Sequence, residues 1–174
     1  MVSDTFLILD AWYVESVSGA SQERPKILSK IALLELCGWL ENWMDDFVKE
    51  LAHETHCKED FILTNVIKNN HGFNYSNNFR AMIVKVIGEY CVSVIERRFE
   101  IQYPGDLERL KNYLGKLKPL RNDLAHNQYN SQIISQAHFY APSALVANFY
   151  NPLTHILENY RQTALSVRNQ LMTE

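Results

Sequence analysis

Turn-forming residues, cysteines and long apolar runs are all scarce in this chain of 174 residues. It has six glycines and five prolines, too few for an all-β chain with many tight turns. No apolar run approaches the ~18–20 residues of a membrane-spanning helix, and little alternating apolar and polar pattern is present. No repeat of fixed period is visible. These absences argue against an all-β fold, a membrane span and a repeat array. They favour a single domain over residues 1–174.

The N-terminal sequence and the cysteines both indicate a cytoplasmic protein. The stretch MVSDTFLILDAWYVE has Asp4 and Asp10 around a very short apolar run and no basic residue before it, unlike a secretory signal peptide. The three cysteines, Cys37, Cys57 and Cys91, are an odd number without the spacing of a disulfide framework. We therefore expect reduced thiols in the cytoplasm and no association with a membrane.

Helical periodicity dominates the chain. Between Pro25 and about Leu51, apolar residues recur at spacings of four and three, which is typical of a long helix with one buried side. A second long helix is expected from about Asn78 to Phe99. Its predicted inward residues are Phe79, Ile83, Val86, Tyr90 and Val94. Shorter helices are expected at 5–18 and 60–68.

Glycine and proline suggest the remaining boundaries. A helix over about 105–114 is expected to stop at Gly115, and Pro119 is expected to begin a short new helix that runs to about Asn127. The last helix begins at Asn151-Pro152, or that pair marks a kink in a longer helix from near Pro142. The predicted fold is an all-α bundle: two long antiparallel helices, a short motif helix and a long C-terminal helix.

Charge is distributed unevenly, although the net charge is only −3. Residues 1–64 carry twelve acids and five bases, whereas residues 65–174 carry eight acids and twelve bases. Between positions 109 and 121 there are five bases and no acid: Arg109, Lys111, Lys116, Lys118 and Arg121. Such a local positive field attracts phosphate groups even on an acidic protein, although a solvated helix face also accounts for the charges alone.

The stretch KPLRNDLAHNQY, residues 118–129, gathers the reactive side chains. If Pro119 begins a helix, Arg121 lies near its third position, where free backbone N–H groups add positive potential. Asn122 and His126 are four residues apart and share a helix face. Arg121 and His126 are five apart, about 140° around an ideal helix. Either the long arginine curls round, or the site needs a second copy of the helix across a two-fold axis.

These residue types could support cleavage of an RNA phosphodiester. The imidazole of His126 can deprotonate a ribose 2′-hydroxyl or protonate the leaving 5′-oxygen at neutral pH. The forked cation of Arg121 fits the charge that develops on the phosphoryl group, and Asn122 can orient the histidine or bond a phosphate oxygen. The products would be a 2′,3′-cyclic phosphate and a 5′-hydroxyl, and nothing in this chemistry requires a metal or another cofactor.

The segment LRNDLAHN resembles the R-x4–6-H motif of ribonuclease-type members of the HEPN superfamily. Arg121, Asn122 and His126 match it position by position over about eight residues, and elsewhere the resemblance is architectural. It implies a HEPN-like helical bundle that forms a homodimer, with two motifs facing each other in a composite cleft. It also implies metal-independent endoribonuclease activity. Many such proteins are toxins or anti-phage effectors, so the resemblance also implies an antitoxin or another regulatory protein as a partner.

Residues around the motif extend the candidate site. Lys116 and Lys118 are candidates for holding the RNA backbone. Tyr129 either stacks on a base or packs against the next helix. The HEPN toxins that are paired with nucleotidyltransferase antitoxins have a tyrosine two residues after the histidine, whereas this chain has Gln128 there. Control by modification of that tyrosine is therefore not implied.

Other interpretations stay open. The segment HETHC, residues 53–57, would place two histidines and a cysteine on one helix face, but zinc usually takes four ligands and no second cluster is visible. We therefore expect no metal site. A HEPN-like protein could also bind RNA, a nucleotide or a protein partner without catalysis. In a third interpretation the motif is a coincidence in a structural helical bundle.

Overall fold

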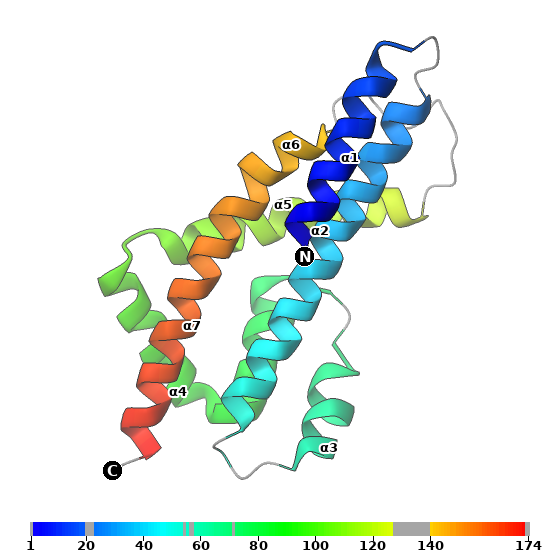
Figure 1. Cartoon of the computed structure of the whole chain (residues 1–174). Helices are drawn as coiled ribbons and strands as arrows, with labels where there is room; N and C mark the ends of the chain where they lie inside the picture. The colour runs from blue at the N-terminus through cyan, green and yellow to red at the C-terminus, as the bar shows by residue number, and fades with distance from the viewer. Residues whose placement is uncertain are drawn as a thin grey trace. The chain divides into compact units, whose positions relative to one another are not determined.

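A computed structural model describes residues 2–19, 23–53, 55, 58–70, 72–126 and 140–172 (Figure 1). Every regular element among these residues is helical, which confirms the predicted all-α class. The expected helices at 5–18, 25–51 and 60–68 are present as α1, α2 and the pair α3 and η1. In chain order the elements are α1 (Val2–Val17), α2 (Glu23–Ala52), α3 (Glu59–Phe61), the π-helical η1 (Ile62–Ile67) and η2 (Tyr75–Phe79), α4 (Arg80–Gln102), α5 (Asp106–His126), α6 (Pro142–Leu145), the π-helical η4 (Val146–Tyr150) and α7 (Asn151–Met172).

The chain groups into two compact units. Unit 1 comprises Met1–Trp39 and Lys116–Pro152, and unit 2 comprises Leu40–Gly115 and Leu153–Glu174. Helices α2, α5 and α7 each contribute residues to both units. The expected single domain over residues 1–174 stays a prediction.

In unit 1, α1 packs against α6 and η4 through one side. Phe6 and Leu9 are buried, and the Phe6 ring lies 5.8 Å from the ring of Tyr150 between centroids. Trp39 of α2 contacts the same tyrosine at 4.7 Å. A carboxylate oxygen of Asp10 accepts a 2.8 Å hydrogen bond from the backbone N–H of Ser143, which satisfies a free donor in the first turn of α6.

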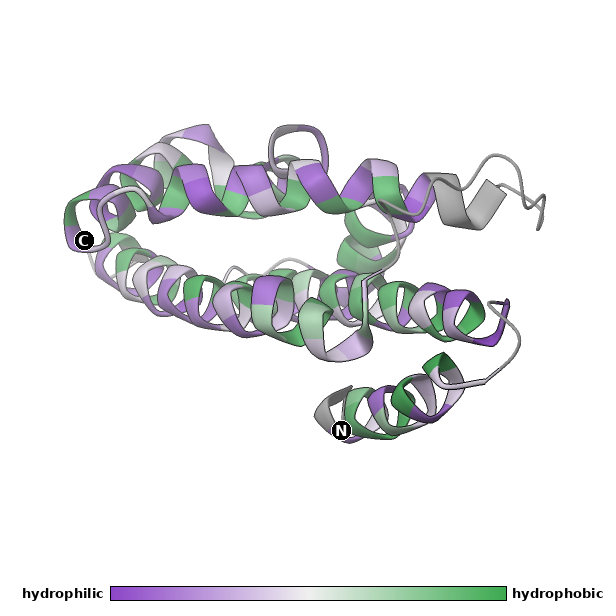
Figure 2. Cartoon of the chain, turned by 90° about the horizontal axis from the view of Figure 1, so that it is seen from above, coloured by the Kyte–Doolittle hydropathy of each residue, from purple (hydrophilic) through white to green (hydrophobic). Residues whose placement is uncertain are grey.

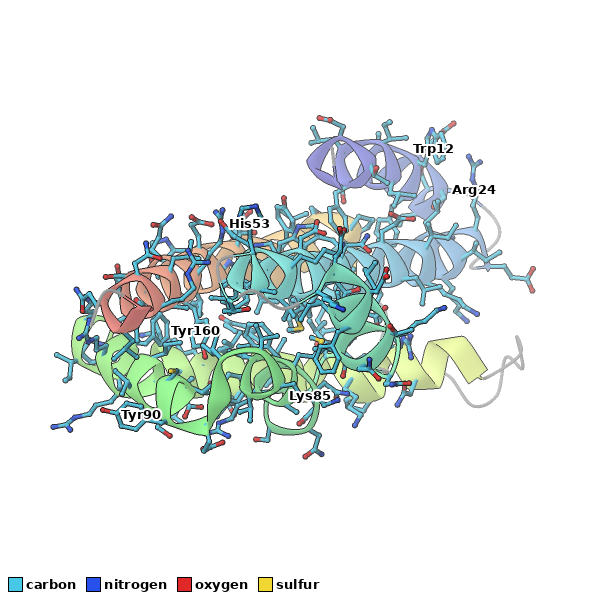
Figure 3. The ribbon with its side chains drawn as sticks, turned by 90° about the horizontal axis from the view of Figure 1, so that it is seen from below. Trp12, Arg24, His53, Lys85, Tyr90 and Tyr160 are labelled. Carbon is cyan, nitrogen blue, oxygen red and sulfur yellow. The ribbon has the colours of Figure 1, made fainter. Side chains whose placement is uncertain are left out.

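In unit 2, aromatic rings from α2, η2, α4 and α7 form the centre of the core. The fully buried ring of Tyr160 lies 5.6 Å from Phe79, 5.2 Å from Phe99 and 6.2 Å from Phe47. Figure 3 shows Tyr160 between α7 and α4. Rings at these separations and tilts stabilise the core beyond their apolar area.

Helix α4 covers nearly all of the second predicted long helix, but the chain reverses direction at Gly88, so the predicted unbroken helix is wrong. Gly88 has φ 82° and ψ 160°, a conformation essentially confined to glycine. In an unbroken helix residues 80 and 96 would lie about 24 Å apart, yet Arg80 Nε donates to Glu96 at 2.9 Å. The inward positions shift accordingly. Tyr90, predicted inward, is 72% exposed, and the buried residues after the break are Val92, Ile95 and Phe99.

Helix α5 is continuous where two helices were expected. Its 21 residues run from Asp106 to His126, with Gly115 and Pro119 inside it. Glycine weakens a helix without ending it, and proline removes one internal hydrogen bond, here to the Gly115 carbonyl. The buried residues Leu110, Leu114 and Leu117 bridge the expected break, so packing outweighs these local costs. The expected short motif helix is therefore wrong.

The C-terminal helix follows the second predicted alternative. Elements α6, η4 and α7 succeed one another without a gap from Pro142 to Met172. The N–H of Asn151 donates to the carbonyl of Val146, a five-residue step of the π type. Pro152, which has no N–H, follows immediately, so the wider turn lies where the regular hydrogen-bond pattern would fail.

Among the described residues, no helix combines the length and apolar character needed to cross a membrane.

Candidate active site

Arg121 occupies the next position of the buried stripe on α5. The buried residues Leu110, Leu114 and Leu117 are spaced four and three apart, and Arg121 follows four later. Its side chain is half-buried. A charged group is costly at such a position unless it is paired or functional. The packing of α5 therefore places a permanent cation at the margin of the apolar side, where charges interact more strongly than in open water.

Asn122 lies beside Arg121 and contacts it. The guanidinium Nη1 donates to the Asn122 side-chain oxygen at 3.5 Å, a long and weak hydrogen bond. Both side chains are half-buried. The structure thus brings together two of the three predicted catalytic residues. Helix α5 extends to His126, but the side chain of His126 lies outside the described residues, and so does all of Tyr129.

The continuity of α5 removes one predicted contribution to the site. Arg121 lies deep within a 21-residue helix and not in a first turn. Free backbone N–H groups occur only in the first four residues of a helix. The positive potential at the motif must therefore come from side chains alone.

The positive segment 109–121 is partly neutralised from within α5. Arg109 donates to Asp106 at 2.9 Å, and Lys111 donates to Glu108 at 2.6 Å. These acids lie just before the segment, so the count of bases alone overstates its field. Lys116 is exposed and Lys118 is half-buried, and their predicted contact with RNA stays a prediction.

A cavity lies among the described residues of each unit, and Arg121 and Asn122 line neither of these two cavities. In unit 1 a largely apolar cavity of about 300 Å³ lies between α1 and the α6–η4 segment, with Phe6 and Tyr150 in its wall. In unit 2 a cavity of about 280 Å³ is lined by Lys49, His53 and Glu59 together with apolar residues.

A metal site is not formed by the residues that the structure describes, since they contain no group of three histidine, cysteine or carboxylate side chains placed to hold an ion. His56 and Cys57 of the HETHC segment lie outside those residues. Of the other two cysteines, Cys37 is buried and Cys91 half-buried, and neither forms a disulfide.

A polar cluster in unit 2 was not anticipated from the sequence. The Tyr75 hydroxyl donates to a Glu96 carboxylate oxygen at 2.7 Å and lies 3.4 Å from the Tyr160 hydroxyl. Arg80 donates to the same carboxylate and to Glu89 at 3.0 Å. The partners are 9 to 85 residues apart in sequence, so no local spacing reveals them.

The electrostatics of this cluster suit a structural role. Burial, and then the neighbouring Tyr160 and Glu96, raise the pKa of Tyr75 well above its usual range, and burial also raises the pKa of Tyr160. The hydrogen bonds to Glu89 and Glu96 raise the pKa of Arg80 further. Both phenols therefore stay protonated and the guanidinium stays charged at neutral pH, as expected for a hydrogen-bonded cluster that holds the helices together.

Comparison with known proteins adds no assignment, since no family model, curated protein or solved structure matches this chain.

Proposed function

We propose that this protein is a HEPN-like, metal-independent endoribonuclease that acts as a homodimer with a composite active site. The motif Arg121-Asn122-x3-His126 carries this proposal. It gains support from the position of Arg121, a half-buried cation in contact with Asn122 where the helical pattern calls for an apolar residue. A two-fold arrangement of the motif helices would bring the arginine of one copy toward the histidine of the other.

The proposed reaction is transfer of the phosphoryl group to the neighbouring ribose oxygen. The His126 imidazole takes the proton of the 2′-hydroxyl while the bond from that oxygen to phosphorus forms. The bond from phosphorus to the 5′-oxygen breaks, and that oxygen receives a proton from an imidazolium. Arg121 stabilises the negative charge on the phosphoryl oxygens, and Asn122 positions the reacting groups. Lys116 and Lys118 hold the flanking phosphates, and Tyr129 stacks on a base.

This activity would suit a cytoplasmic toxin or anti-phage defence effector, restrained by an antitoxin or another protein.

The second candidate is a HEPN-like protein that binds RNA, a nucleotide or a partner without catalysis. The ion pairs of Arg109 and Lys111 favour it, because they weaken the positive field that would hold a long RNA.

The decisive experiment is cleavage of end-labelled RNA by the wild type, His126→Ala and Arg121→Ala. Loss of a catalytic acid–base group lowers the rate by about 10²–10⁴-fold, so we expect cleavage by the two variants to be close to background. Products of the wild type should carry 2′,3′-cyclic phosphate and 5′-hydroxyl ends, and EDTA should not inhibit. The matched controls are His155→Ala and Arg109→Ala, which remove an exposed histidine and an exposed arginine outside the motif.

Wild-type rates in His126→Ala would exclude the catalytic role of the motif. Binding of RNA that Arg121→Ala abolishes, without any cleavage by the wild type, would establish the second candidate. Far-UV circular dichroism and thermal unfolding of each variant separate a catalytic loss from a folding defect.

A further inference from the structure

Exposed large apolar side chains are concentrated in unit 1 of the described part of the chain. Among the described residues, eight of the twelve clearly exposed large apolar side chains belong to unit 1. Five are on α1 and three on the N-terminal half of α2: Leu7, Ile8, Trp12, Val14, Val17, Ile27, Ile31 and Leu34. Figure 2 shows α1 as hydrophobic over much of its circumference, and Figure 3 shows Trp12 on its outer side. A large exposed apolar surface often marks a site of contact with another protein.

Three exposed residues of α2, continued by the half-buried Gly38, follow the pattern of a helix–helix contact. Ile27, Ile31, Leu34 and Gly38 are spaced four, three and four apart, as in the d, a, d and a positions of a coiled coil. This α2 stripe lies opposite the side that contains the buried residues Ala32 and Leu36. It is therefore a second apolar seam, distinct from the seam that packs inside the chain.

Gly38 is unexplained by the packing of its own chain. A Cβ added there would meet nothing within 4 Å, and Gly38 is not among the glycines with positive φ. Glycine lowers helix stability relative to alanine, so neither space nor backbone conformation accounts for it. At an a position on an exposed seam, a glycine permits the close approach of another helix.

Charges beside the stripe are complementary to a second copy of the same helix. Lys30 and Glu35 occupy the g and e positions on opposite sides of the stripe. Five residues apart, they point about 140° away from each other on one helix. In a parallel pair of helices, g of one copy faces the following e of the other, so Lys30 faces Glu35 twice by symmetry. In an antiparallel pair, g positions face g positions, so the side that carries Lys30 in one copy would face the same side of the other copy.

We infer that the α2 stripe is a self-association surface, on which a second copy of this chain packs in parallel. The stripe alone is short for a stable coiled coil, which needs about three heptads or more, and a stable dimer buries about 800 Å² per partner. The five exposed side chains of α1 belong to the same unit and supply further apolar area. This inference rests on the proposed function in one respect: it assigns the contact surface of the proposed homodimer. Self-association is measured separately from RNA cleavage.

The first test is the mass in solution, measured by light scattering and sedimentation at micromolar concentrations. We expect the wild type at twice the chain mass of 20.3 kDa and Ile31→Glu at the single mass. The matched control is Ile101→Glu in unit 2, because Ile101 is also exposed (70%, against 40% for Ile31) and lies outside the surface. Its mass should equal that of the wild type. A monomeric wild type, or a dimer that Ile31→Glu leaves intact, overturns the inference.

The second test uses charge reversal. Lys30→Glu and Glu35→Lys should each weaken the dimer by roughly 3- to 30-fold, because each places like charges in two symmetric contacts. The double variant restores both contacts and should return the dissociation constant to within about 3-fold of the wild-type value, as expected for two directly coupled residues. A double variant that dimerises no better than the singles contradicts the parallel pairing.

The third test fixes the orientation. Parallel pairing in register places position 31 of one copy beside position 31 of the other, so Ile31→Cys should form a covalent dimer on mild oxidation, whereas Ile101→Cys and the wild type should not. Failure of Ile31→Cys to cross-link in a dimer of the correct mass excludes this surface. A wild type that dimerises through the stripe without cleaving RNA refutes the proposed function alone. A dimer that cleaves RNA and that Ile31→Glu leaves intact refutes the inference alone, whereas a monomer that cleaves RNA also refutes the composite site of the proposed function.

Discussion

At the scale of single residues, the cations of α5 differ in their surroundings. Arg109 and Lys111 belong to the positive segment of α5, but each lies in an ion pair with an acid three residues before it. Arg121 takes the position of an apolar residue in the stripe of α5, and its half-buried side chain donates to the side-chain oxygen of Asn122. The motif, more than the count of bases, is therefore the feature of α5 that indicates phosphate chemistry.

The hydrogen bond of Tyr75 to Glu96 should contribute measurably to stability. Tyr75→Phe removes a donor to a carboxylate in a largely buried cluster, and a bond to a charged group contributes about 1.5–3 kcal/mol. We expect the free energy of unfolding in urea to fall by about that amount.

The control for this prediction is Tyr90→Phe. Its hydroxyl belongs to a side chain that is 72% exposed, and substitutions at such sites usually change stability by less than about 0.5 kcal/mol. Equal stability losses in the two variants would contradict the role assigned to the cluster.

How far single residues could be predicted depended on sequence distance. Arg121, Asn122 and His126 fall within six positions, so their spacing was informative. Tyr75 and Tyr160 are 85 residues apart, and nothing in a linear pattern joins them. A hydrogen bond between distant residues is created by the fold, and the sequence shows the donor and the acceptor without showing that they meet.

At the scale of elements, the effects of glycine and proline on the helices differed from those expected from the local sequence. Gly115 and Pro119 were expected to separate two helices, yet α5 continues through both because its leucine stripe remains buried. Gly88 was expected inside a helix, yet it breaks α4 and reverses the chain. The same residue type thus has opposite effects in two helices, and tertiary packing determines which one occurs.

The reversal at Gly88 leads to a prediction with an internal control. Gly88→Ala places a Cβ on a residue with φ 82°. The space around Gly88 is open, but residues with a side chain rarely adopt this backbone conformation. We expect a loss of about 1–3 kcal/mol in the free energy of unfolding. In Gly115→Ala the space is equally open and the backbone is helical, so stability should rise by up to about 1 kcal/mol.

Urea unfolding of both variants and the wild type provides the measurement. A Gly88→Ala protein as stable as Gly115→Ala would show that α4 has no turn that requires glycine. It would also remove the explanation for the exposure of Tyr90.

At the scale of the whole molecule, a few ion pairs couple stability to pH. Arg161 holds both carboxylate oxygens of Glu50, at 2.6 and 2.7 Å, and Arg168 donates to the Glu50 carbonyl at 2.8 Å. These contacts join α7 to the end of α2 within unit 2. The hydrogen bond from Arg161 lowers the pKa of Glu50 below its usual range, against the opposing effect of burial.

Glu50 should therefore stabilise the fold at neutral pH and lose this effect in acid. A carboxyl whose pKa is lower in the folded state contributes fully above its unfolded pKa of about 4.3, and its contribution disappears as pH falls through the folded value. Glu50→Gln should lower stability at pH 7 by about 0.5–1 kcal/mol, since the pair is partly exposed. The difference from the wild type should vanish at low pH.

Asp45 supplies a comparison of opposite sign on the same helix. Burial is the largest cause that raises the pKa of Asp45, and Asp46 and Glu41 raise it further. Its charged form is therefore disfavoured in the folded protein, and Asp45→Asn should raise stability at pH 7 while Glu50→Gln lowers it. Thermal unfolding of the three proteins between pH 3 and pH 7 measures both effects. Parallel curves for the two variants would contradict the assigned causes.

The sequence by itself determined the helical class, the long amphipathic α2 and the reactive character of the Arg121 to His126 stretch, because each depends on residues within a few turns of one another. Only the tertiary structure decided where α4 turns, that α5 does not stop at Pro119, and that eight large apolar side chains are exposed among the described residues of unit 1. These features depend on which apolar stripes are buried against other helices of the folded chain. A stripe looks the same in the sequence whether it is covered by the same chain or left exposed for a second copy.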